Sequence, residues 1–222
     1  MEGSEGVLMS RIIIIGGHGK VALLLAPLLV ARGDEVTSVI RNPEHSDEIS
    51  AAGATPVVAD VESLDVAALA ELFAGHDAIV WSAGAGGGPA ARTYSVDRDA
   101  AIRSIDAAGS AGVRRYVMVS YFGARPDHGV PEGNGFYAYA QAKAAADAHL
   151  RGSALEWTIV APSALTLHEP TGRIDPDAME SGAVSRADVA AVVAAALATP
   201  SSVGRTIRFN KGEVPIGEAV GG

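Results

Sequence analysis

The most constraining feature of this sequence is a run of four isoleucines that ends in a glycine-rich turn. Residues 11–15 are Arg-Ile-Ile-Ile-Ile, and Gly-Gly-His-Gly follows at residues 16–19. A run of β-branched residues is typical of a strand buried on both faces. The turn leads into a helix that extends to about Arg32, with Pro27 expected to kink it. The apolar positions that should form the buried stripe of this helix are Val21, Leu24, Leu25, Leu28 and Leu29.

The same alternation of strand and helix continues along the chain. We predict strands over residues 11–15, 35–40, 54–58, 77–82, 115–120, 157–161 and 205–209. We predict helices over residues 20–32, 43–52, 64–73, 94–111, 136–151, 186–198 and 215–220. This pattern indicates an α/β fold, a single doubly wound domain with a parallel sheet of strand order 3-2-1-4-5-6.

Domain organisation follows from the same pattern. Residues 1–10 are acidic and contain Gly and Ser, so we expect a disordered leader, and residues 11–222 should form the domain. Residues 121–135 and 162–182 are expected to be long irregular loops on the substrate side, because they exceed ordinary connections.

Composition excludes several classes of protein. With a net charge of −9, nucleic-acid binding is not expected, and the absence of cysteine excludes disulfides and thiolate chemistry. The longest apolar run, residues 21–31, is too short to cross a bilayer, and residues 1–10 lack the basic and apolar regions of a signal peptide, so we expect none. We therefore expect a cytoplasmic protein without a membrane partner, as a monomer or homodimer. The six histidines are scattered without ligand spacing, so no metal site is expected.

The glycine turn points to a nucleotide. Between a strand and a helix, glycines allow a pyrophosphate to approach backbone N–H groups at the helix N-terminus, where a side chain would keep it out. We assign the cofactor's diphosphate to Gly16, Gly17, His18, Gly19, Lys20 and Val21. A purely structural tight turn or a mononucleotide site are the alternatives.

The residues after the second strand bear on which dinucleotide is bound. An acidic residue there favours NAD, but this chain has Arg41 and Asn42, and Arg41 can pair with the 2′-phosphate of NADP. NADP is therefore the expected cofactor, with NAD as the less favoured one; the alternative is a solvated surface arginine. Asp60 and Val61 follow the third strand, where Asp60 can meet the adenine or cap a helix.

A tyrosine and a lysine supply candidate chemistry. Tyr139 and Lys143 stand at i and i+4 and share a helix face. The ammonium should lower the pKa of the phenol and make Tyr139 an acid or base, and Lys143 can also bond the nicotinamide ribose. Ser120, at the end of the fifth strand, can bond a substrate oxygen. The alternative is a surface tyrosine beside a solvated lysine. Asp97, near a predicted helix start, is expected to complement the helix dipole.

These motifs, in order, resemble the short-chain dehydrogenase/reductases. The residues that carry the resemblance are 16–21, 39–43, 139–143, 157–162, 184–190 and 214–219. They are most similar to the atypical NAD(P)H-binding branch, which includes biliverdin reductase B-like and nitrogen-regulator-like proteins.

The resemblance implies a Rossmann domain with NAD(P) across the strand ends. It implies that Ser120, Tyr139 and Lys143 are the catalytic set. It further implies that Ser82, Ala83 and Gly84 line the cofactor and that Pro162 borders the nicotinamide. Ala161 departs from the pattern, because arginine often precedes that proline in the family.

The sequence therefore predicts an NADP-dependent oxidoreductase that acts on a small carbonyl or conjugated substrate. Two alternatives stay open. One is a redox-sensing module that binds NADP without turnover, since this branch includes such proteins. The other is an epimerase or dehydratase with a tightly held cofactor.

Overall fold

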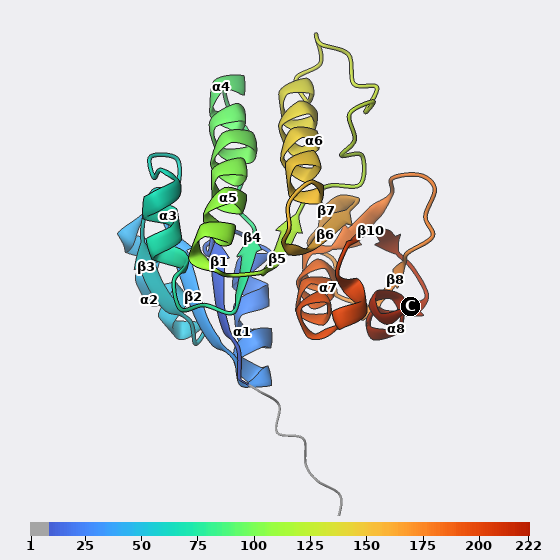
Figure 1. Cartoon of the computed structure of the whole chain (residues 1–222). Helices are drawn as coiled ribbons and strands as arrows, with labels where there is room; N and C mark the ends of the chain where they lie inside the picture. Colours follow the sequence, from blue (N-terminus) through green and yellow to red (C-terminus); the bar gives the residue numbers. More distant parts are fainter. Residues whose placement is uncertain (1–8) are drawn as a thin grey trace, which may run out of the picture.

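The computed structural model describes residues 9–222, which form an α/β domain around one nine-stranded sheet (Figure 1). The sheet order is β11-β8-β10-β6-β5-β4-β1-β2-β3. Its parallel strands are β1 (Arg11–Ile15), β2 (Glu35–Ile40), β3 (Thr55–Val58), β4 (Ala78–Trp81), β5 (Arg115–Val119), β6 (Glu156–Pro162) and β10 (Arg205–Lys211). The predicted order 3-2-1-4-5-6 is confirmed, because β1 lies between β2 and β4.

Four short strands complete the fold. The antiparallel strands β8 (Arg173–Asp175) and β11 (Val214–Pro215) extend the sheet beyond β10. A separate parallel pair consists of β7 (Ala164–Thr166) and β9 (Ala183–Ser185). The expectation of a wholly irregular segment at 162–182 is therefore wrong, because strands of three residues are too short to give a periodic sequence pattern.

The described chain contains eight α-helices. They are α1 (Ala22–Arg32), α2 (Ser46–Ala51), α3 (Val66–Phe73), α4 (Ala90–Thr93), α5 (Ala101–Ala111), α6 (Tyr137–Arg151), α7 (Arg186–Ala198) and α8 (Ile216–Gly221). The predicted helix at 94–111 begins earlier, at Ala90, and contains a π-helical segment, Tyr94–Ala100. None of the helices within residues 9–222 is long and apolar enough to cross a membrane.

The isoleucine run explains how the core divides. Ile12 and Ile14 belong to the cluster under α1 and α7, whereas Ile13 and Ile15 belong to the cluster under α3, α5 and α6. Successive side chains of a strand point to opposite faces, so a strand covered on both sides needs an apolar residue at every position. All four isoleucines are accordingly buried.

Helix α1 differs from its prediction in two ways. Its buried stripe is Ala22, Leu25, Ala26 and Leu29, at i, i+3, i+4 and i+7, and the predicted core residues Leu24 and Leu28 lie outside it and are exposed. The helix also continues through Pro27, whose side chain lies on the exposed face of the helix.

The predicted leader, residues 1–10, stays a prediction. Residues 1–8 lie outside the described residues. Ser10 already belongs to the folded domain, because its carbonyl accepts a hydrogen bond from the N–H of Glu35 and its own N–H donates to Asp34.

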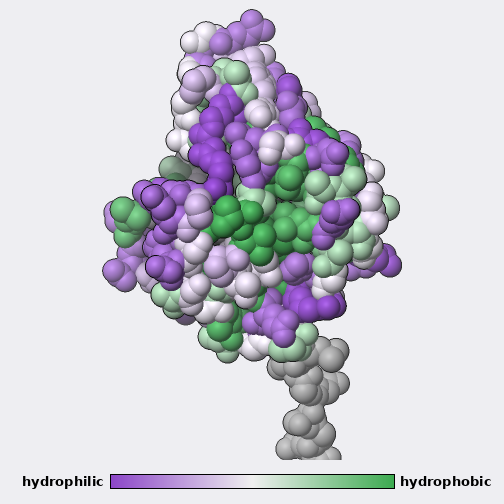
Figure 2. Space-filling model, turned by 90° about the vertical axis from the view of Figure 1, so that its left-hand side faces the viewer, coloured by the Kyte–Doolittle hydropathy of each residue, from purple (hydrophilic) through white to green (hydrophobic). Residues whose placement is uncertain are grey.

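The face at the β3 end of the sheet has an apolar area near its centre with hydrophilic side chains around it (Figure 2), and Val58 of this edge strand is exposed.

Candidate active site

A cavity of about 310 Å³ opens at the carboxyl ends of β1, β2, β3 and β4. This is where the strand order reverses, the place where ligands bind in doubly wound sheets. Ten of the predicted cofactor residues line it: Gly16, His18, Gly19, Arg41, Asn42, Asp60, Val61, Ser82, Ala83 and Gly84.

Five predicted cofactor residues do not line this cavity in the described structure: Gly17, Lys20, Val21, Lys143 and Pro162. Lys20 is exposed and Val21 packs into the core beneath α1, so neither side chain faces the cavity. Seven lining residues were not predicted: Val39, Ile40, His45, Ala59, Glu62, Arg92 and Val96.

Two glycines of the turn also have a packing role. Gly16 has φ +81°, and a Cβ there would lie 2.6 Å from the Cα of Ala83. A Cβ on Gly17 would lie 2.6 Å from the Cβ of Ser38. These two glycines therefore let β1 pack closely against its neighbours, rather than only keeping space for a phosphate.

The first turn of α1 suits an anion. In the described structure its N-cap, Val21, makes no side-chain capping bond, and the first turn carries no acidic residue. The N–H groups of Leu23, Leu24 and Leu25 already donate to the carbonyls of Gly19 and Val21, so the positive end of the helix dipole is what favours a bound negative group here.

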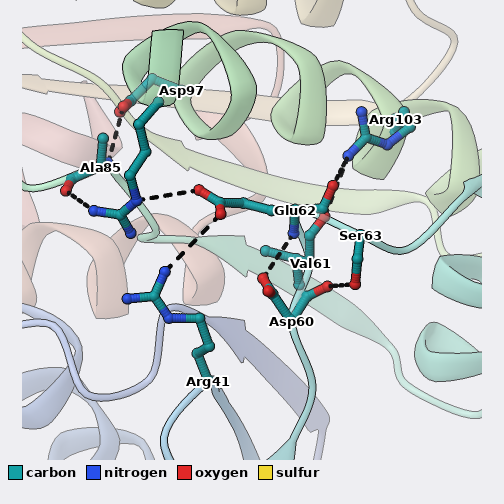
Figure 3. Close-up of polar contacts among 9 residues, drawn as sticks. Arg41, Asp60, Val61, Glu62, Ser63, Ala85, Asp97 and Arg103 are labelled. Atoms are coloured by element: carbon teal, nitrogen blue, oxygen red, sulfur yellow. Dashed lines mark hydrogen bonds and ion pairs between the residues drawn. The ribbon is translucent and has the colours of Figure 1, made fainter. Parts of the chain in front are cut away.

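Two arginines meet one carboxylate in the cavity (Figure 3). Nη1 of Arg41 lies 3.9 Å from Oε2 of Glu62, and Nε of Arg92 lies 3.3 Å from Oε1 of the same side chain. Their exposed fractions are 57% for Arg41, 38% for Arg92 and 24% for Glu62. Arg92 comes from α4, far along the chain, so only the fold brings it opposite Arg41.

Asp60 shapes the loop that carries Glu62. Its Oδ1 accepts a hydrogen bond from the N–H of Glu62 at 3.1 Å, and its carbonyl accepts one from the hydroxyl of Ser63 at 2.8 Å (Figure 3). The guanidinium of Arg103 donates to the carbonyls of Val61 and Glu62 from the other side. Asp60 is not a helix cap, since Asp65 caps α3 by accepting from Ala68.

The prediction that Asp97 complements a helix dipole is wrong. Because the helix begins at Ala90, Asp97 lies inside it, fully buried in the π-helical segment. Its carboxylate accepts the N–H of Ala85 at 2.9 Å, and a Cβ on Gly84 would lie 3.0 Å from its Oδ1. Asp97 thus holds the glycine-rich loop after β4, and burial raises its pKa.

The predicted catalytic residues Ser120 and Lys143 are both buried. Ser120 donates a hydrogen bond to Oδ2 of Asp147 at 2.6 Å. Nζ of Lys143 donates to the carbonyl of Val119 at 2.8 Å, and the side chain is 1% exposed. Burial lowers the pKa of Lys143, while Asp147 and Asp97 act to raise it.

Asp147 was not singled out from the sequence. It stands four residues after Lys143 on α6, so the helix places both on the sheet side. It is 0% exposed, and burial raises its pKa despite the nearby Lys143. The spacing Tyr139, Lys143, Asp147 is the signal that would have found it.

Tyr139 lies among aromatic rings. Its ring centroid is 5.1 Å from that of Phe136 and 5.4 Å from that of Tyr121. Burial raises the pKa of the Tyr139 phenol, and the charges of Asp97 and Asp147 raise it further. The predicted lowering by Lys143 is therefore wrong for this state of the protein, and the phenol stays protonated.

No group of three or more His, Asp or Glu side chains within residues 9–222 could hold a metal ion.

Comparison with known proteins gives close matches over nearly the whole chain. A family profile described as NAD(P)H-binding matches residues 16–200. A Bacillus subtilis protein described as an uncharacterized sugar epimerase is 34% identical over 215 residues, which cover 95% of this chain and 98% of the relative. A Saccharomyces cerevisiae protein without an assigned activity is 31% identical, covering 93% of this chain and 95% of the relative.

Solved structures agree. A Bacillus halodurans protein described as an NAD-dependent epimerase/dehydratase has a TM-score of 0.87 and 33% identity, covering 95% of this chain and 98% of its own. An oxidoreductase from Lactococcus lactis has a TM-score of 0.84 and 28% identity, covering 95% and 94%. An anaerobilin reductase from Escherichia coli, at 23% identity and a TM-score of 0.75, shares the fold, with 92% and 98% covered.

Proposed function

The chain belongs to the NAD(P)H-binding family, and on this premise we propose that it is an NADP-dependent oxidoreductase acting on a small carbonyl or conjugated substrate. The observation that carries the proposal is the cavity at the strand-order reversal, where two arginines converge on a single anionic group. A nicotinamide dinucleotide with a third phosphate matches both features.

The described residues fit such a cofactor. Gly19 and the positive end of the α1 dipole would hold the diphosphate, and Arg41 with Arg92 would hold the 2′-phosphate. The segment 82–84 would line the cofactor, and Pro162, which lies outside this cavity, would border the nicotinamide.

The position of Glu62 supports NADP over NAD. Its carboxylate sits between Arg41 and Arg92 at 3.9 and 3.3 Å, as a phosphate oxygen would. Arginine presents donors in a planar fork that suits both carboxylate and phosphate. We therefore infer that the 2′-phosphate replaces Glu62 between these arginines.

The residues near Ser120 can supply a proton to the substrate oxygen and orient that oxygen. When bound, the nicotinamide cofactor supplies hydride to the substrate carbon. Tyr139, which keeps its proton because its pKa is raised, donates it to the substrate oxygen. Ser120 uses its hydroxyl hydrogen in a hydrogen bond to Asp147, so its oxygen would be free to accept a hydrogen bond from the hydroxyl that forms. Lys143 donates a hydrogen bond to the carbonyl of Val119, which fixes the position of its ammonium group in the site.

The proposal is tested by binding and turnover. NADPH and NADH are titrated by calorimetry, and NADPH oxidation is followed by absorbance with a panel of small aldehydes, ketones and enones. We expect tighter binding of NADPH than of NADH and oxidation with at least one member of the panel. Binding of neither cofactor would contradict the proposal.

A second candidate function is epimerisation or dehydration with a retained cofactor. Relatives at 34% and 33% identity carry epimerase or epimerase/dehydratase descriptions, and these observations favour it. Cofactor that copurifies with the protein, and conversion of a sugar nucleotide without net NADPH consumption, would support this function. A redox sensor would instead prefer NADP⁺ or NADPH and turn over no substrate.

A further inference from the structure

A second cavity, of about 230 Å³, lies between α6, the segment after β5 and the strands β6 and β10. It is lined by Tyr121, Phe122, Ala124, Arg125, Asp147, Arg151, Ala161, Thr206 and Arg208. Among the described residues it shares none with the cofactor cavity. It is therefore a separate site that the proposed cofactor does not fill.

Positive charge surrounds this cavity, although the chain as a whole has a net charge of −9. Arg151 donates only to the hydroxyl of Thr206, at 3.3 Å, and the guanidinium of Arg208 lies 5.7 Å from the ring centroid of Phe122. Within residues 9–222, neither arginine forms an ion pair with a carboxylate. Arg125, the third, pairs with Asp127 at 3.4 Å.

The cavity wall also contains buried polar atoms that lack partners. Among the described residues, no hydrogen bond reaches Oδ1 of Asp147 or the hydroxyl of Tyr121. The other carboxylate oxygen of Asp147 accepts from Ser120. A buried acceptor without a donor is unfavourable and is ordinarily satisfied by water or a ligand. The cavity thus offers free cations at its rim and a free acceptor in its wall.

We propose that this cavity binds a small hydroxylated anion, a hydroxy acid or a hydroxylated phosphate ester. Arg151 and Arg208 hold its carboxylate or phosphate, and its hydroxyl donates to Oδ1 of Asp147. Arginine is the residue best suited to such planar anions. Asp147 then connects the occupant to Ser120 through two hydrogen bonds, one at each of its carboxylate oxygens.

The site is tested on the full-length protein by calorimetry in a buffer free of phosphate and carboxylate. Four probes separate the contributions: lactate, propionate, glycerol 3-phosphate and glycerol. Lactate and propionate differ by the hydroxyl, whereas glycerol 3-phosphate and glycerol differ by the phosphate. We expect at least one hydroxylated anion to bind at least tenfold more tightly than its matched partner. Preference for lactate or for glycerol 3-phosphate identifies the anion as carboxylate or phosphate.

Arginine variants locate the binding. Arg208→Ala and Arg151→Ala each change an exposed side chain and should weaken the tighter probe at least tenfold. Arg114→Ala is the control, because it removes the same charge from an arginine that is 72% exposed and pairs with Glu156 outside the cavity. The proposal is overturned if no probe binds the wild-type protein, or if Arg114→Ala weakens binding as much as Arg208→Ala.

NADPH titration of the same samples keeps the two proposals apart. Anion binding without NADPH binding would refute the proposed function and leave this site standing. NADPH binding without anion binding would refute this site and leave the proposed function standing.

Discussion

Glu62→Gln should strengthen NADPH binding and leave NADH binding nearly unchanged. The carboxylate lies between Arg41 and Arg92, the two groups we assign to the 2′-phosphate. Glutamine keeps the size of the side chain and the backbone hydrogen bonds of the loop, which the N–H and carbonyl of residue 62 make. The substitution therefore removes one negative charge and little else.

The magnitude follows from the distances. Two unit charges about 4 Å apart interact by about 1 kcal/mol in water. Glu62 pairs with two arginines, at 3.9 and 3.3 Å, and the 2′-phosphate has to displace both pairs. Removing this competition should then gain about 1–2 kcal/mol. That corresponds to NADPH binding about 5- to 30-fold tighter.

The assay is calorimetric titration of NADPH and NADH at low and high salt. The gain for NADPH should shrink at high salt, because ions screen charges that water reaches. Glu71→Gln is the matched control, since this glutamate is exposed on α3 and does not line the cavity within the described structure. An unchanged ratio of NADPH to NADH affinity would refute the reasoning. Weaker NADPH binding would also refute it, because the carboxylate would then order the arginines instead of competing with the phosphate.

Four further predictions concern the turn, the cofactor and the proton donor. Arg41→Ala should weaken NADPH binding by about 1.5 kcal/mol more than NADH binding. This is the low end of the range for a charged hydrogen bond, because the Arg41 side chain is 57% exposed. Calorimetry measures both affinities, and equal losses for the two cofactors would contradict the prediction. Tyr139→Phe should lower kcat for carbonyl reduction about 100- to 10,000-fold with NADPH binding retained, and equal turnover would remove Tyr139 from the mechanism. Since the pKa of Tyr139 is raised, its phenol stays protonated as pH rises, so wild-type carbonyl reduction should show no loss from tyrosine ionisation up to about pH 9; a fall that Tyr139→Phe abolishes would contradict this. Gly16→Ala should lower the free energy of unfolding, measured by urea titration, by about 1–3 kcal/mol more than Gly33→Ala does. Both glycines have positive φ, but only at Gly16 does an added Cβ lie 2.6 Å from the backbone of Ala83. Equal losses of stability would show that the close contact relaxes freely.

The sequence by itself determined the architecture and pointed to the cavity at the reversal of strand order. Four consecutive isoleucines predict a strand covered on both faces, and the two core clusters divide them by alternate positions. The glycine turn after that strand predicts the cavity, and Gly16, Gly19 and Arg41 line it. These predictions succeed because they rest on neighbours in the chain, whose spacing fixes the geometry.

Only the tertiary structure decided what surrounds each of these side chains. Arg92 comes from a four-residue helix and meets Glu62 from a different loop, and no local pattern indicates that pair. The raised pKa of Tyr139 likewise depends on Asp97, which the sequence places 42 residues earlier, and on burial under neighbouring rings. Desolvation and charge act through space, so a one-dimensional spacing of tyrosine and lysine predicts the wrong sign when the fold brings carboxylates closer.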